Sequence, residues 1–265
     1  MCISDVNLIK LCLPERKSKH FILHLSMNNR NRGKNTSDDS LFGSQKQIDL
    51  LRMAVEDMHY LLSRKYPEKA SSEFAGNRYR LKTRQIQAIR GASASQQQML
   101  NRKSKQATAE DLKGKTIHID GFNVLIVLES LLSGAYIFEG LDGCFRDLSG
   151  VHGTYKRVNQ TLPALQLVAT FFQQCGIGKL CWIFDRPVSN SGRICQLISE
   201  FAKERELQWE TSLEFNPDQF LAEHGEIIIS SDAWILDHCK RWFNLIRYMV
   251  DKENLNAHII QFSLA

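Results

Sequence analysis

The sequence lacks the signatures of several large classes of protein. It has no zinc-ligand spacing, no Walker loop and no dinucleotide-binding fingerprint, which disfavours nucleotide cofactors and structural zinc. Its seven cysteines are odd in number and form no C-x-x-C pair. Together with the absence of a secretory segment, this predicts reduced thiols and a cytoplasmic protein. Charged residues near the start interrupt every apolar run before roughly 18 residues accumulate, so no membrane-spanning helix is expected.

The chain has the composition of a globular protein, but its charges are unevenly divided. Of its 265 residues, 43% are hydrophobic and 24% are charged, enough for a main domain and a smaller one. Residues 1–115 hold 22 Lys and Arg against 11 Asp and Glu, a net charge of +11, whereas residues 116–265 hold 12 against 18, a net charge of −6. This division fits a basic module that holds a polyanion beside an acidic, metal-binding module. A solvated helical surface is the alternative.

The chain divides into four predicted segments. Residues 1–44 end in a polar stretch without apolar periodicity and are expected to be a divergent or disordered extension, in which Met27 offers an alternative start. Residues 45–92 carry apolar residues at helical spacing and predict a small all-α, helix-turn-helix-like domain. Residues 93–115 predict a polar linker or helix, and residues 116–265 an α/β domain.

A basic cluster lies in the small helical segment. It consists of Arg78, Tyr79, Arg80, Lys82 and Arg84. Arginine and lysine contact phosphates, and an aromatic ring stacks on a base, so the cluster is a candidate nucleic-acid-binding surface. The alternative is a helical packing module with no such role.

The last segment alternates predicted strands with predicted helices. The strands are expected at 116–119, 180–184, 209–213, 226–230 and 258–262. The helices are expected at 124–132, 162–175, 192–205, 217–223 and 233–250, with an acidic loop at 139–152. Strands that alternate with helices predict a three-layer α/β domain with a mainly parallel sheet.

An aspartate follows three of the predicted strands. Asp120 follows the first, Asp185 the second and Asp232 the fourth. Ligands of open parallel sheets bind outside the carboxyl ends of the strands, so these aspartates can converge in one crevice. Converging carboxylates repel one another unless a cation neutralises them, and oxygen-only ligation suits Mg²⁺ or Mn²⁺. The alternative for each aspartate alone is a turn or a helix cap.

Other polar residues close to these aspartates in sequence are candidates for supporting roles. The amide of Asn123 can orient Asp120 or a bound water. The helix after Asp185 begins with groups that could hold a phosphate or simply cap the helix: Ser189, Asn190, Ser191 and Arg193.

Three further residues have weaker assignments. His152, in a glycine-flanked turn, is a candidate acid or phosphate donor, although a local hydrogen-bonding role is the alternative. Asp218 is expected to begin a helix, with a lesser chance of a role behind the metal ligands. Asp237, five residues after Asp232, is expected to be structural.

Longer strings of the sequence carry a resemblance to a known family. Asp120-Gly-Phe-Asn123 and Ser230-Ser-Asp-Ala-Trp-Ile-Leu236, with the strand and helix order after residue 116, resemble a PIN-like nuclease domain. Residues 45–265 resemble an uncharacterised prokaryotic family in which a small helical domain of unknown function precedes a PIN-like domain. The strings that carry this likeness are Asn77-Arg-Tyr79, Asp142-Gly143, Arg146-Asp-Leu-Ser-Gly-Val-His-Gly153 and Asp185-Arg-Pro-Val-Ser-Asn-Ser-Gly-Arg193.

The resemblance implies a fold, a chemistry and a set of site residues. PIN-like domains have a five-stranded parallel sheet in the order 3-2-1-4-5, with acidic residues that bind one or two divalent ions and cleave phosphodiesters, usually of RNA. By this likeness Asp120 and Asp232 match the acids after the first and fourth strands, and Asp185 resembles an acid of flap-nuclease-like relatives. The candidates for the remaining acid are, in order of preference, Asp147, Asp142 and Glu139.

The sequence therefore predicts a nuclease that depends on Mg²⁺ or Mn²⁺ and acts on RNA rather than DNA. One or two ions would polarise the phosphate and activate a water. The catalytic candidates are Asp120, Asp185, Asp232 and Asp147, with Asp142 as a further metal ligand. The alternative is a non-catalytic nucleic-acid-binding or scaffold protein with a PIN-like fold. No membrane partner is expected, and the sequence does not predict an oligomeric state.

Overall fold

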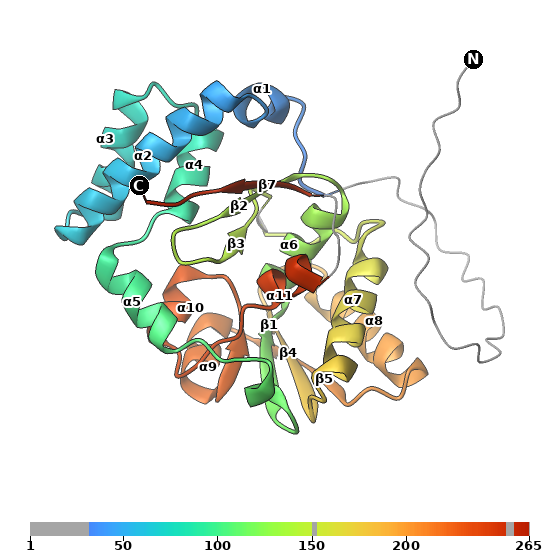
Figure 1. Ribbon diagram of the computed structural model, residues 1–265. Coiled ribbons are helices and arrows are strands. Elements are labelled where there is room, and N and C mark those ends of the chain that lie inside the picture. The colour runs from blue at the N-terminus through green and yellow to red at the C-terminus, as the bar shows by residue number, and fades with distance from the viewer. Residues whose placement is uncertain (1–31, 150–152, 253–256, 265) are drawn as a thin grey trace, which may run out of the picture.

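The computed structural model describes residues 32–149, 153–252 and 257–264, in which a helical N-terminal part lies beside an α/β part (Figure 1). Met27 and His152 lie outside these ranges. Within them, no helix combines the length and the apolar character that crossing a bilayer requires.

From residue 32 onward, the N-terminal part consists of five helices. They are α1 (Asp38–Phe42), α2 (Gln45–Ser63), α3 (Glu68–Arg78), α4 (Thr83–Ala92) and α5 (Gln96–Ser104). Helices α2, α3 and α4 surround an apolar core in which Leu51, Met58 and Ile89 are fully buried. The hydroxyl oxygens of Ser44 and Ser95 each accept a hydrogen bond from a backbone N–H group in the first turn of α2 and of α5. Such side-chain caps favour these two starting points for the helices.

Helix α1 packs tightly, although the sequence predicted a divergent or disordered extension over residues 1–44. The ring of Phe42 is fully buried, with its centroid 5.0 Å from that of Phe138 and 5.5 Å from that of Tyr136. The carboxylate of Asp38 accepts two hydrogen bonds from Arg84, at 2.7 and 2.9 Å. Two residues thus anchor this short helix, and no apolar periodicity is needed for that.

A four-stranded parallel sheet forms the centre of the α/β part. Its strands are β1 (Thr116–Asp120), β4 (Lys179–Asp185), β5 (Trp209–Glu214) and β6 (Ile227–Ile229). They lie side by side in the order β5-β4-β1-β6, and every neighbouring pair is parallel. The carboxyl ends of all four strands therefore lie at one edge of the sheet.

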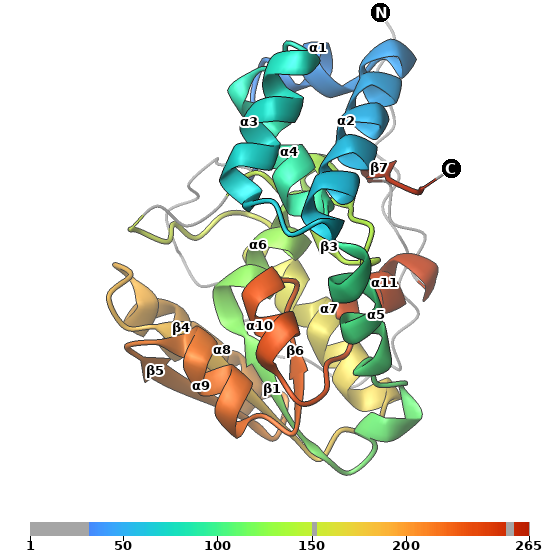
Figure 2. The ribbon, with the colours of Figure 1, turned by 90° about the vertical axis from the view of Figure 1, so that its left-hand side faces the viewer.

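Helices cover both faces of this sheet. They are α6 (Gly121–Leu132), α7 (Thr161–Gln174), α8 (Ser191–Glu204), α9 (Pro217–His224), α10 (Ala233–His238) and α11 (Leu245–Lys252). Because side chains alternate between faces along a strand, Trp182 packs in the core with α6, α7, α8 and α11, while Ile183 packs with α9 and α10. Figure 2 shows α9 and α10 on the face turned toward the viewer. A sheet covered on both sides explains why β4 and β6 are largely apolar, whereas the edge strand β5 carries mostly polar residues.

The last strand does not join the central sheet, and the predicted five-stranded order is met by four strands only. Strand β7 (His258–Gln261) pairs in parallel with β2 (Tyr136–Glu139), which pairs antiparallel with β3 (Phe145–Arg146). Part of the predicted acidic loop is thus a hairpin. Ile260 and Phe138, on paired strands, belong to the apolar core of the helical part, and this core holds β7 away from the central sheet.

The predicted helix 233–250 is interrupted between α10 and α11. The backbone N–H of Trp242 donates to the carbonyl of Lys105, and its carbonyl accepts from the N–H of Ala107. The indole N–H of Trp242 donates to the carbonyl of Arg102 at 2.7 Å, and the ring is buried. Pairing with this distant segment replaces the helical hydrogen bonds, which the apolar periodicity alone did not reveal.

Candidate functional site

Four aspartates lie at the carboxyl edge of the central sheet and interact through their charges. We call them the aspartate cluster: Asp120, Asp185, Asp218 and Asp232. Asp120 and Asp185 end β1 and β4, and Asp232 follows β6 by three residues. Asp218 lies in the first turn of α9, which follows β5. The charges of Asp218 and Asp232 both raise the pKa of Asp120, and those of Asp232 and Asp185 raise the pKa of Asp218.

Asp120 is the most buried member of the aspartate cluster. Its residue is 9% exposed, and burial of the carboxyl group raises its pKa to about 8 despite a hydrogen bond from the Ser230 hydroxyl at 2.8 Å. Repulsion from Asp232 and Asp218 acts in the same direction as burial. No cationic side chain in the described part of the chain forms an ion pair with Asp120. A bound cation would supply the missing charge compensation.

Asp218 has a more direct role in the site than the sequence predicted. The helix-start role belongs to Asn216, whose side-chain oxygen accepts a hydrogen bond from the N–H of Gln219 at 3.3 Å. The carboxylate of Asp218 is therefore left to face the cluster, where burial and then the charges of Asp232 and Asp185 raise its pKa. The signal in the sequence was Asn216-Pro217, a cap and first helical residue that together make a second acidic cap unnecessary.

The loop between β6 and α10 ties Asp232 to Asp120. The Ser230 hydroxyl donates to Asp120 Oδ2 and its oxygen accepts from the N–H of Asp232 at 3.0 Å. Asp232 Oδ1 accepts from the backbone N–H groups of the first turn of α10, at 2.8 and 3.1 Å. Asn123 Oδ1 accepts from both the N–H and the hydroxyl of Ser231, each at 2.8 Å. The side chain of Asn123 therefore positions this loop, while its backbone N–H donates a hydrogen bond to the Asp120 carboxylate.

The aspartate cluster fits a hard divalent cation by its donor chemistry. All of its donors are carboxylate oxygens, which suit Mg²⁺ and Mn²⁺, and burial raises the pKa of Asp185 as well as that of Asp120. Within the described ranges, however, no three or more His, Cys, Asp or Glu side chains are gathered into a ready-made metal site. A metal ion would thus have to draw these carboxylates closer together.

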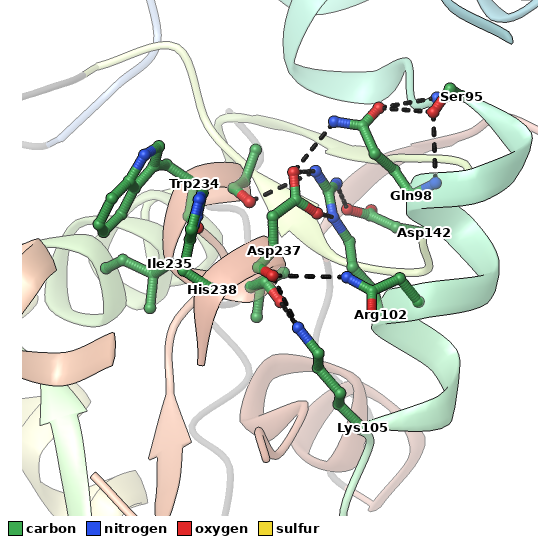
Figure 3. A network of polar contacts seen from close by, with 12 residues as sticks. Ser95, Gln98, Arg102, Lys105, Asp142, Trp234, Ile235, Asp237 and His238 are labelled. Atoms are coloured by element: carbon green, nitrogen blue, oxygen red, sulfur yellow. Dashed lines mark hydrogen bonds and ion pairs between the residues drawn. The ribbon is translucent and has the colours of Figure 1, made fainter. Parts of the chain in front are cut away.

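Asp142 lies outside the cluster, buried between two arginines. Arg146 donates two hydrogen bonds to its carboxylate, at 2.9 and 2.6 Å. Arg102 donates one more at 2.6 Å (Figure 3). Burial alone would raise the pKa of Asp142, but the two guanidinium groups hold it at about 2. Both carboxylate oxygens are engaged, so we leave Asp142 out of the candidate metal site.

The same arginines hold the segment that carries Asp232, and with Asp142 and Asp237 we call them the arginine network. Arg102 on α5 donates to both carboxylate oxygens of Asp237 on α10, at 2.7 and 2.9 Å (Figure 3). Arg146 donates to the carbonyl of Ser231 at 2.8 Å. Asp237, expected to be structural, thus fixes α10 against α5, and the arginine network positions Asp232 through the backbone.

The other two candidates for the remaining acid are also remote from the cluster. Asp147 accepts hydrogen bonds from the N–H of Ser149 and the hydroxyl of Ser130. Ser130 is ten residues along α6 from Asp120, which corresponds to about 15 Å of helix. Glu139 forms an ion pair with Arg247 and accepts a hydrogen bond from Gln261 at 3.0 Å. Neither carboxylate faces Asp120 in this arrangement.

The polar residues after Asp185 mainly fix the turn into α8. The Ser191 hydroxyl lies 2.5 Å from the carbonyl oxygens of both Asp185 and Val188, and the Asn190 amide donates to the Tyr155 carbonyl at 2.9 Å. Ser189 pairs through its backbone with residues 153 and 155. Arg193 is exposed and forms no ion pair within the described ranges. Of this group, Arg193 retains the most freedom to contact a phosphate.

The basic cluster of the helical part is partly neutralised by acids. Arg84 is paired with Asp38, and Asp57 receives both the Tyr79 hydroxyl, at 2.9 Å, and an ion pair from Arg78, at 3.3 Å. The remaining two members, Arg80 and Lys82, are exposed and have no ion pair in the part of the chain that the structure describes. They are the cations of this cluster that remain free for a polyanion.

Comparison with known proteins divides the chain in the same two parts. Residues 50–105 match Protein of unknown function (DUF434), and residues 109–248 match Domain of unknown function (DUF5616). An uncharacterized protein of Methanocaldococcus jannaschii, MJ0935, is 31% identical over 201 residues, which are 76% of this chain and 93% of that protein. No solved structure matches. The expected helical domain of unknown function is confirmed, whereas neither match names a PIN-like domain. The chain therefore belongs to the DUF5616 family and carries a DUF434 domain ahead of that domain.

Proposed function

We propose that the protein is a metal-dependent phosphodiesterase, a cytoplasmic nuclease that acts on RNA rather than DNA and whose α/β part is PIN-like. The observation that carries the proposal is the aspartate cluster, and above all Asp120, a buried carboxylate without a cationic partner in the described part of the chain. The strand order β5-β4-β1-β6 supports the proposal, because it agrees with four of the five strands of the expected PIN-like order and the carboxyl ends of these strands meet at the edge where ligands of open parallel sheets bind. The five described cysteines are free thiols, in agreement with a reducing compartment.

The residues of the site would share the work of binding and orientation. Asp120, Asp185, Asp218 and Asp232 would hold one or two Mg²⁺ or Mn²⁺ ions, which polarise a phosphate and lower the pKa of an attacking water. Asp120 has to lose its proton before it can act as a ligand. The Ser230 hydroxyl orients its carboxylate, and the arginine network keeps Asp232 beside it. Arg80, Lys82 and Arg193 would contact the phosphates of the substrate.

A non-catalytic nucleic-acid-binding or scaffold protein is the second candidate. The observation that favours it is the absence, among the described residues, of a ready-made group of three or more metal-ligating side chains. In this case the acidic edge would bind a cation weakly or none, and Arg80 and Lys82 would account for the measurable activity.

The two candidates are separated by a cleavage assay with the full chain. End-labelled single-stranded RNA is incubated with wild type, Asp120→Asn and, as a matched control, Asp49→Asn, which alters an exposed carboxylate on α2. Each protein is tested with Mn²⁺, Mg²⁺ or EDTA. The nuclease proposal expects metal-dependent cleavage by wild type and Asp49→Asn, and a loss of at least 100-fold in Asp120→Asn.

The same proteins are then tested for binding of the RNA. Asp120→Asn is expected to bind as well as wild type, because it removes only a negative charge. If folded wild type cleaves neither RNA nor DNA with any of these ions, while Arg80→Ala combined with Lys82→Ala abolishes binding, the nuclease proposal fails and the binding protein replaces it.

A further inference from the structure

An exposed tryptophan lies two residues from Asp232. Trp234, in the first turn of α10, is 46% exposed, which is unusual for so large an apolar ring. Its backbone N–H donates to Asp232 Oδ1 at 2.8 Å, so the residue that carries the ring contacts the aspartate cluster through its backbone. Two residues of chain span at most about 7 Å, which is the scale of one nucleotide.

The indole is held rigidly for stacking. The ring of His238, one turn later on α10, stacks on it with centroids 4.2 Å apart and an angle of 22° between the planes. His238 Nδ1 lies 2.7 Å from the Trp234 carbonyl oxygen, a hydrogen bond that fixes the histidine ring. Figure 3 shows the indole directed away from Arg102 and the arginine network. The tryptophan therefore does not serve that network and presents its ring to solvent.

Trp234 forms one wall of a groove that contains a member of the aspartate cluster. The groove has a volume of about 540 Å³ and is lined by residues of α9 and α10: Asn216, Asp218, Gln219, Ala222, Glu223, Trp234 and His238. Gln219 donates to Glu223 at 2.8 Å and accepts from the Asn216 amide at 3.2 Å. These contacts preorganise a polar wall opposite the aromatic pair.

The chemistry of the groove selects one part of a nucleotide. Asp218 and Glu223 would repel a phosphate but would accept hydrogen bonds from the N–H groups of a base. The indole offers a flat apolar surface, on which every base can stack. A base in a duplex is already stacked on its neighbours, so the groove fits a base of a single strand.

A second exposed aromatic lies close in sequence to the cluster. Phe215, which follows β5, is 74% exposed, and the guanidinium of Arg186 lies 4.8 Å from the centre of its ring. Arg186 directly follows Asp185. A cation and an aromatic ring are thus available next to Asp185.

We propose that Trp234 is the stacking platform for a base of a single-stranded nucleic acid, next to the phosphate held at the aspartate cluster. The base lies in the groove between α9 and α10, with its N–H groups toward Glu223 and toward the oxygen of Asp218 that is not bound to a metal ion. This inference rests on the proposed nuclease function for the nature of the substrate. It adds the residue that positions the strand and predicts a preference for single strands over duplexes.

The test measures binding separately from cleavage. The full chain with Asp120→Asn, which prevents turnover, is titrated into a fluorescein-labelled eight-nucleotide RNA, and fluorescence anisotropy is followed. Trp234→Ala and Trp234→Phe are added to this background. Phe74→Ala, which removes a 54% exposed ring on α3, is the matched control. A series of RNAs, each with one abasic position, a DNA of the same sequence and the RNA duplex complete the set.

The platform predicts a specific pattern. Trp234→Ala weakens binding of the intact RNA about 10-fold, Trp234→Phe much less, and Phe74→Ala not at all. One of the abasic RNAs binds the parent protein, which keeps Trp234, about as weakly as the intact RNA binds the Trp234→Ala variant. Binding of that abasic RNA is not weakened further by Trp234→Ala. The duplex shows no dependence on Trp234. DNA behaves as RNA does if only the base is recognised.

Two results would overturn the platform. One is equal binding by Trp234→Ala and its parent protein, which includes the case of no binding by either. The other is that Trp234→Ala weakens the binding of every abasic RNA by the same factor. Neither result affects metal-dependent cleavage by the wild type, so the platform can fail while the nuclease stands. Conversely, if Trp234→Ala weakens binding in a base-dependent way but the wild type cleaves no substrate, the stacking platform is supported and the nuclease proposal is refuted.

Discussion

Replacing Asp120 by asparagine should make the metal-free protein more stable at neutral and alkaline pH. In the folded state burial raises the pKa of this carboxyl group from 3.8 to about 8. The unfolded chain loses the proton near pH 4, whereas the folded chain keeps it to about pH 8. Folding is therefore favoured by this group below pH 4, and the free energy of unfolding falls as pH rises from about 4 to about 8.

Raising the pKa of Asp120 from 3.8 to about 8 corresponds to roughly 6 kcal/mol of free energy of unfolding. This is a large part of the 5–15 kcal/mol that stabilises a typical domain. Asparagine resembles the protonated acid in shape and carries no charge to bury. Between pH 5 and pH 8 the variant should gain about 4 kcal/mol relative to wild type, and above pH 8 the difference should level off.

Urea unfolding in EDTA, followed by tryptophan fluorescence at pH values from 5 to 9, measures this difference. Other titrating groups affect both proteins alike, so the comparison isolates Asp120. Asp49→Asn, on the exposed face of α2, should run parallel to wild type at every pH. If the curve for Asp120→Asn also runs parallel to wild type, Asp120 is ionised at neutral pH and the argument for an uncompensated buried carboxyl group fails.

Three further predictions test other parts of the structure. Mn²⁺ should bind wild type about tenfold more tightly for each pH unit from 6 to 8, because Asp120 must release its proton when the ion binds. Calorimetry in buffers of different protonation enthalpy should detect the released proton. Equal affinity at pH 6 and pH 8 would contradict this prediction. Arg102→Met should cost about 3–5 kcal/mol in urea unfolding, since it strips a buried partner from Asp142 and Asp237, whereas exposed Arg193→Met should stay within about 0.5 kcal/mol. Phe42→Ala should cost about 3–5 kcal/mol by the same measurement because its ring is fully buried, and a loss as small as that of Phe74→Ala would show that α1 does not anchor the helical part.

The sequence predicted what depends on neighbouring residues. Apolar strands that each end in an aspartate place Asp120 and Asp185 at the sheet edge, because strand direction and alternation are local properties. The small helical domain and the parallel α/β sheet followed in the same way from periodicity. Asp218 received less weight because a helix-start residue is the commoner role for an aspartate in that position.

The sequence could not reveal features that depend on distant partners. Asp142 is paired with Arg102, which is 40 residues away, and no local pattern announces that ion pair. Strand β7 has the composition of a fifth strand for the central sheet, yet its pairing with β2 is decided by Ile260 and Phe138 in the core of the helical part. Trp242 continues the helical period of α10, but its backbone pairs with the segment after α5.

The pairing of β7 with β2 has a consequence for how the protein can be divided. The two family matches meet between residues 105 and 109, a natural place to cut an expression clone. A fragment that begins after residue 105 would leave Phe138 and Ile260 exposed, since both pack against helices of the other part. Each half should therefore aggregate when produced alone, and the two should recover solubility when they are expressed together. The boundary between the two family matches would then mark a unit of inheritance and not a unit of folding.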